Sequence, residues 1–104
     1  MNRSSIDGLE LLVKLDIILN KEQSEIFKRR YDYVGRIYKE KHIQIDYSGL
    51  IKVTAVAYSY INDEKNPDQN LQDEFYEKLK SNSATMNKIR VLSQKRRIIM
   101  HTMN

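Results

Sequence analysis

The amino-acid sequence predicts an all-α protein, a small bundle of about five helices forming a single domain over residues 1–104. Apolar residues recur at spacings of three and four over long segments, which is the period of an amphipathic helix. Three glycines and one proline are the strongest helix breakers present, so the chain is rarely interrupted. A chain of this length buries about two-thirds of its unfolded surface, which is enough for one modest core.

The first two helices are expected over residues 6–19 and 21–41. The first of these helices carries a broad apolar stripe, and its expected N-cap is Ser4 or Ser5. Before the second, the sequence NKEQ at 20–23 is a capping box, in which two side chains bond each other's backbone amides. The second segment separates its apolar and charged residues most clearly, so it is the best amphipathic helix in the sequence.

Residues 43–61 admit two interpretations. Apolar residues occur at every second position, as in two β-strands, and Ser48 and Gly49 could join these strands in a hairpin turn. This interpretation gives an α+β fold as the alternative. A tight turn at that point places the apolar face of one strand opposite the polar face of the other. We therefore favour a helix over residues 49–62 with Ser48 as its N-cap.

A second capping-box pattern, NPDQ, predicts the fourth helix. Asn66 would be the N-cap, Pro67 the first helical residue and Gln69 the side chain that reaches back, with the helix ending at about Lys80. Its inward-facing residues are expected to be Leu71, Phe75 and Leu79.

The last helix is expected to follow Ser83 as its N-cap. Its inward-facing residues would be Met86, Ile89, Leu92 and Ile99. Five helices joined by short connections form a small bundle.

Charge is unevenly distributed along the chain, which has a formal net charge of +4 and a pI near 9.3. Residues 21–42 hold seven basic and four acidic side chains, residues 43–80 hold four and seven, and residues 81–104 hold five and none. The second and last helices are therefore basic, and side by side they would form a positive surface for nucleic-acid phosphates. The residues of this surface would be Lys28, Arg29, Arg30, Arg36, Lys88, Arg90, Lys95, Arg96 and Arg97.

The leading hypothesis is thus a small non-enzymatic protein that binds the backbone of DNA or RNA, within a larger nucleoprotein assembly. Two ordinary explanations compete with it. Basic side chains are common on solvated helix faces, and Glu25 and Asp32 lie one turn from the arginines of the second helix, where they can form ion pairs.

The alternative function is a protein-interaction module, such as an inhibitor, an adaptor or a dimeric regulator that meets an acidic protein partner or a second copy of itself. Tyr-x-Tyr pairs at 31–33 and 58–60 cannot turn both rings inward on a helix, so one ring of each pair should be exposed. Three consecutive apolar residues near the C-terminus also cannot all face one core. The expected contact residues are Tyr33, Tyr58, Ile98, Ile99 and Met100.

Several classes of chemistry lack their usual residues. Without cysteine, thiolate catalysis and Cys-based zinc sites are excluded, and His42 and His101 are too far apart in the sequence to form a histidine pair at helical spacing. No phosphate loop, nucleophile elbow or Ser–His pair is visible, so we expect no enzyme, no cofactor and no metal. No apolar run approaches the length of about 20 residues that spans a bilayer, and the expected location is cytoplasmic.

A helix-turn-helix arrangement would use residues 49–62 as its recognition helix. That segment carries a single cation, Lys52, which is too little positive charge for a surface that reads DNA.

Overall fold

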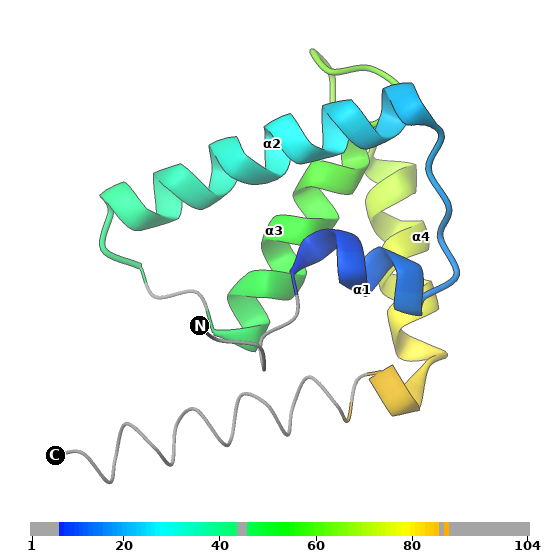
Figure 1. The fold of residues 1–104 in the computed structure, drawn as a ribbon. Helices are drawn as coiled ribbons and strands as arrows, with labels where there is room; N and C mark the ends of the chain where they lie inside the picture. Colours follow the sequence, from blue (N-terminus) through cyan, green and yellow to red (C-terminus); the bar gives the residue numbers. More distant parts are fainter. Residues whose placement is uncertain (1–6, 44–45, 86, 88–104) are drawn as a thin grey trace, which may run out of the picture.

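The computed structural model of the chain describes residues 7–43, 46–85 and 87. They form α1 (Gly8–Lys14), α2 (Lys21–Glu40), α3 (Tyr47–Ser59) and α4 (Gln69–Lys80), and the backbone is helical again at residues 83–85 and 87 (Figure 1). No strand occurs in this part of the chain. The predicted all-α bundle is therefore confirmed, and the hairpin alternative for residues 43–61 is wrong because α3 occupies most of that segment.

Helix α3 is the centre of the bundle and packs against α1, α2 and α4 (Figure 1). Six of the seven residues in its last two turns, 53–59, are buried, and Val56 is half-buried. Two buried hydroxyls are compatible with this position because they bond within the helix. Thr54 Oγ1 donates to the carbonyl of Leu50 at 2.7 Å, and Ser59 Oγ donates to the carbonyl of Val56 at 2.6 Å. The buried C-terminal half of α3 is not accessible to a DNA groove, and the more exposed N-terminal half carries Lys52 as its single cation.

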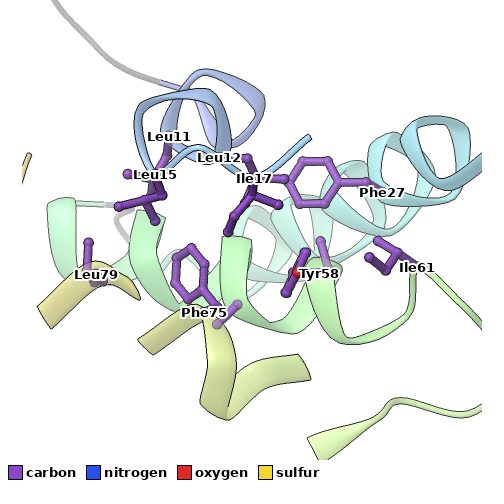
Figure 2. Packing of buried hydrophobic residues seen from close by; sticks show 11 residues of the cluster. Leu11, Leu12, Leu15, Ile17, Phe27, Tyr58, Ile61, Phe75 and Leu79 are labelled. Carbon is purple, nitrogen blue, oxygen red and sulfur yellow. The ribbon is translucent and has the colours of Figure 1, made fainter. Parts of the chain in front are cut away.

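The core is built from side chains of all four helices and the turns beside them (Figure 2). Phe27 of α2 points toward α1 in this view, and Phe75 of α4 lies against the ring of Tyr58 with their centroids 6.3 Å apart. Phe75 and Leu79 were predicted to face inward, and both are buried. The members of the cluster are Leu11, Leu12, Leu15, Ile17, Phe27, Ala55, Ala57, Tyr58, Ile61, Phe75 and Leu79.

The predicted capping box of α2 is present. The Gln23 amide donates to Asn20 Oδ1 at 2.8 Å, and the Asn20 amide donates to Gln23 Oε1 at 3.0 Å. Two of the four backbone donors that lack an intrahelical partner at this helix end are therefore satisfied locally.

The predicted N-caps of the other helices are wrong. Asp7, Asp46 and Asp68 cap α1, α3 and α4, each accepting a bond from a backbone amide two or three residues further on. A carboxylate both accepts this bond and interacts favourably with the positive end of the helix dipole. The expected caps were Ser4 or Ser5, Ser48, and Asn66, and Pro67 consequently precedes α4. Asn82, and not Ser83, accepts from the Thr85 amide at 3.0 Å.

Helix α1 is shorter than the predicted segment 6–19 because the chain turns at Asp16, whose φ is 61°. The Ile17 amide donates to the carbonyl of Leu12 at 2.9 Å, which is the six-to-one bond of a Schellman C-cap. Ile17 returns to the core, and the next residue, Ile18, is 92% exposed in the connection to α2. The apolar run at 17–19 therefore belongs to a connection and not to a helical stripe.

Gly8 permits a close approach of α1 to α2. A Cβ atom at this position would lie 2.3 Å from Cε2 of Tyr31 and 3.1 Å from Cζ of Phe27. Only a residue without a side chain fits this contact unless the Tyr31 ring moves.

Candidate functional site

The four basic residues predicted on α2 do not form one uniformly positive face. Lys28, Arg29 and Arg36 are exposed, whereas Arg30 turns toward the connection between α3 and α4. The exposed side of α2 also carries carboxylates among its cations, so its surface charge is mixed. These exposed acidic residues are Glu22, Glu25, Asp32 and Glu40.

Arg29 forms a two-pronged ion pair with Glu64 of the α3–α4 connection. Its Nε donates to Oε2 at 3.0 Å and its Nη2 donates to Oε1 at 2.9 Å. These hydrogen bonds hold the pKa of the Glu64 carboxyl below its ordinary value and raise the pKa of Arg29. Among the described residues, the arginines of α2 therefore pair with Glu64 of a distant loop. Within this part of the chain they do not pair with Glu25 or Asp32 of the same helix, as the sequence allowed.

Arg30 lies between two tyrosine rings. Its guanidinium carbon is 4.8 Å from the ring centroid of Tyr60 and 5.5 Å from that of Tyr33, which are cation–π distances. Its Nε is buried and stands 3.7 Å from Glu64 Oε2, which is too long for a hydrogen bond, and it has no other partner among the described residues. Tyr33 is 50% exposed, so this Tyr–Arg–Tyr stack reaches the surface at the Tyr33 end.

The α3–α4 connection, residues 60–68, is held to the body at several points. The Asp68 amide donates to the carbonyl of Ser59 at 2.8 Å and closes the loop, and Gln23 Nε2 of α2 donates to Asn62 Oδ1 at 3.0 Å. Inside the loop, the Asp63 carboxylate accepts from the side chain of Asn66 and the amide of Lys65, and these bonds lower its pKa. Glu64 is therefore presented to α2 by a defined loop. Glu64 was not among the predicted site residues, although the acidic pair Asp63–Glu64 is visible in the sequence.

Tyr58 was predicted at an exposed contact, and this is wrong. The residue is 4% exposed because it faces Phe75 in the core. Its hydroxyl donates to Glu74 Oε2 at 3.3 Å, and burial together with this carboxylate raises the pKa of Tyr58 to about 12. In the pair 58–60 the partly exposed ring is Tyr60, while Tyr33 is exposed as expected.

The remaining predicted site residues lie outside the described residues. They are Lys88, Arg90, Lys95, Arg96, Arg97, Ile98, Ile99 and Met100. The sequence still locates the charge: residues 7–80 hold 12 basic and 14 acidic side chains, and residues 88–104 hold five basic and none acidic. The whole positive surplus of the protein is therefore at its C-terminal end.

Two exposed apolar residues were missed as candidates. Val13 is 69% exposed on α1, and Ile18 follows in the connection to α2. Periodicity places both in the apolar stripe of the first predicted helix. Val13 instead lies on the outer side of α1, and Ile18 lies beyond the early end of this helix.

Within the described ranges, no three histidine, aspartate or glutamate side chains are grouped closely enough to hold a metal ion. None of the helices there combines the length and the apolar character needed to cross a bilayer. No protein-family model matches this chain, and neither a curated protein nor a solved structure matches it.

Proposed function

We propose that this is a small non-enzymatic protein that binds the phosphate backbone of nucleic acids, principally through residues 88–104. The observation that supports this function is the segregation of charge: a slightly acidic body precedes a C-terminal segment with five cations and no carboxylate. Clustered lysine and arginine release the counterions condensed on a polyanion, which provides affinity without sequence discrimination.

Helix α2 has a smaller part in this proposal than its composition suggests. Glu64 offsets the charge of Arg29 and lies beside Arg30, so these two arginines are occupied in the fold. Lys28 and Arg36 remain exposed on α2 and are the phosphate contacts that the body can add.

The salt dependence of binding tests the proposal. If the five C-terminal cations each neutralise one phosphate of a single strand, the logarithmic slope of affinity against salt is about −3.5, or roughly a 100-fold loss between 50 and 200 mM salt. Replacing Lys95, Arg96 and Arg97 by Ala should make the slope shallower by about 2. Replacing Lys28 and Arg36 by Ala should change it by no more than about 1.4.

Fluorescence anisotropy with a labelled oligonucleotide of mixed sequence measures these slopes. Absence of binding at low salt would exclude the function. An unchanged slope in the variant lacking Lys95, Arg96 and Arg97 would show that the C-terminal segment does not hold the phosphates.

A protein contact is the second candidate, supported by the exposure of Val13 and Ile18. Burial of exposed apolar side chains against a partner is favourable because it removes their surface from water. If the partner is a second copy, light scattering on the full chain should give a dimer that Ile18→Glu converts to a monomer. A wild-type protein that stays monomeric at high concentration contradicts this arrangement.

A further inference from the structure

The Tyr33–Arg30–Tyr60 stack, which joins α2 to the C-cap residue of α3, is not used in the phosphate-binding proposal. It combines an arginine held between two aromatic rings with a half-exposed ring at the surface. Aromatic rings and the planar guanidinium groups that stack on them are the surfaces on which unpaired nucleic-acid bases lie.

The stack is held in place before any ligand binds. The guanidinium of Arg30 lies over the rings of both Tyr33 and Tyr60. Its neighbour Arg29 fixes Glu64 through two hydrogen bonds, and Glu64 in turn faces Arg30 at 3.7 Å. Tyr33 therefore has a defined neighbour on one ring face, and a ligand does not have to order it.

Charge decides which kind of contact this patch can make. Glu64 offsets one of the two adjacent arginines, so the patch attracts phosphate only weakly. An exposed ring does not depend on net charge and stacks on any base. Arg36 is exposed three residues after Tyr33, one turn along α2, where it can meet a phosphate adjacent to a stacked base.

We propose that Tyr33 is a stacking platform for an unpaired base, so that the nucleic acid bound by this protein is single-stranded. The inference rests on the proposed function, because the C-terminal cations supply the general affinity. Residues 88–104 hold the backbone, and Tyr33 with Arg30 beneath it selects strands whose bases are free to leave a stack. A duplex, whose bases are already paired and stacked, gains nothing from Tyr33.

The test compares a single strand with a hairpin duplex of the same length and composition. Tyr33→Ala should weaken binding of the single strand by about 5- to 100-fold and leave binding of the duplex unchanged. Tyr33→Phe keeps the aromatic face and should retain wild-type affinity for both. Asn70→Ala, which shortens an exposed side chain on α4 away from the stack, is the control and should change neither.

A direct readout uses the wild-type protein. A thymidine-rich oligonucleotide carrying one 2-aminopurine should lose fluorescence on binding, because stacking quenches this base, and Tyr33→Ala should restore the fluorescence at saturation. This measurement does not depend on how the variant affects affinity.

The possible failures are distinguishable. One failure is salt-dependent binding that is equally tight for single strand and duplex and is unaffected by Tyr33→Ala. This result overturns the inference but not the proposed function, and Tyr33 would then be assigned to a protein contact. No binding to either ligand at low salt overturns both.

Discussion

At the scale of single residues, two glycines of the first two helices have opposite requirements. Gly8 faces the rings of Tyr31 and Phe27 at distances that a Cβ atom cannot occupy, whereas a Cβ atom at Gly35 would meet nothing within 4 Å. The first glycine allows two helices to touch, and the second adds only backbone freedom to the middle of α2.

Replacing each glycine by alanine should therefore shift stability in opposite directions. Gly8→Ala forces the Tyr31 ring aside and should lower the free energy of unfolding by about 1–3 kcal/mol. Gly35→Ala should raise it by up to about 1 kcal/mol, since alanine favours the helix. Thermal unfolding followed by circular dichroism measures both, and about 1 kcal/mol corresponds to roughly 4–8 °C for a domain of this size. Equal effects would contradict the close approach at Gly8.

The buried hydroxyl of Tyr58 makes stability depend on alkaline pH. Its pKa is raised to about 12 in the folded protein, chiefly by burial and also by Glu74, from an ordinary value near 10. Because the unfolded chain loses this proton first, the stabilising contribution is complete below pH 10 and is lost as pH rises through 12. Tyr58→Phe should flatten this decline and remove the last step from the absorbance titration of tyrosinate. Its cost at neutral pH should be small, about 1 kcal/mol, since Glu74 can turn to water.

At the scale of helices, mutation can distinguish the N-cap residues that the structure shows from those that the sequence predicted. The Asp46 carboxylate accepts from the Gly49 amide at 3.0 Å at the start of α3. Asp46→Ala should lower the free energy of unfolding by about 1 kcal/mol. Ser48→Ala is the matched control and should have no destabilising effect, because alanine favours the first turn of a helix. Chemical denaturation measures both, and a larger loss in the serine variant would favour Ser48 as the cap.

The α3–α4 connection, which Glu64 holds against α2, should separate from this helix in acid. The ion pair between Glu64 and Arg29 holds the pKa of the Glu64 carboxyl below its ordinary value. The stability that this ion pair adds is therefore fully present above pH 4.5 and is lost as pH falls through the lowered pKa. Glu64→Gln removes the charge at all pH values. The protection factors of the amides in residues 61–67, which compare exchange with the intrinsic rate at each pH, should be lower in this variant at neutral pH. Acidification should lower them less in the variant than in the wild type. Identical exchange in the two proteins would show that the ion pair does not hold the loop.

The positions of the helices followed from periodicity, as did both ends of α2 and the end of α4 at Lys80, whereas the starts of the other helices and the end of α1 did not. The apolar spacing of α2 and the capping box at Asn20 are local signals that the neighbouring packing reinforces. At the other helix starts two or three polar residues compete as caps, and the choice depends on where tertiary contacts place the first turn. The end of α1 depends on Asp16 entering the left-handed region, a conformation for which glycine is the usual signal.

At the scale of the whole molecule, the candidate site was predicted only in part. Composition revealed the basic C-terminal segment and the cations of α2. It could not reveal that Glu64, 35 residues after Arg29, would offset one of those cations, because that encounter depends on how the chain folds back. For the same reason, the spacing of the two rings could not show that Tyr58, predicted as an exposed contact residue, is buried, because its packing against Phe75 of α4 depends on the tertiary structure.

The separation of charge leads to a prediction that net charge alone does not make. Replacing Lys88, Arg90, Lys95, Arg96 and Arg97 by Gln changes the formal charge from +4 to about −1. Replacing Lys14, Lys52, Lys65, Lys78 and Lys80 by Gln makes the same change while leaving the C-terminal cluster intact.

If the position of the charges governs binding, the first variant should lose affinity for oligonucleotides at 50 mM salt by about 100-fold or more, since five phosphate contacts disappear. The second should retain most of its affinity and its salt slope, because scattered lysines contribute only long-range attraction that this salt concentration partly screens. Circular dichroism establishes that both variants are folded before binding is measured by anisotropy. Equal losses in the two variants would reduce the proposed site to a general effect of net charge, and the C-terminal segment would then have no special role.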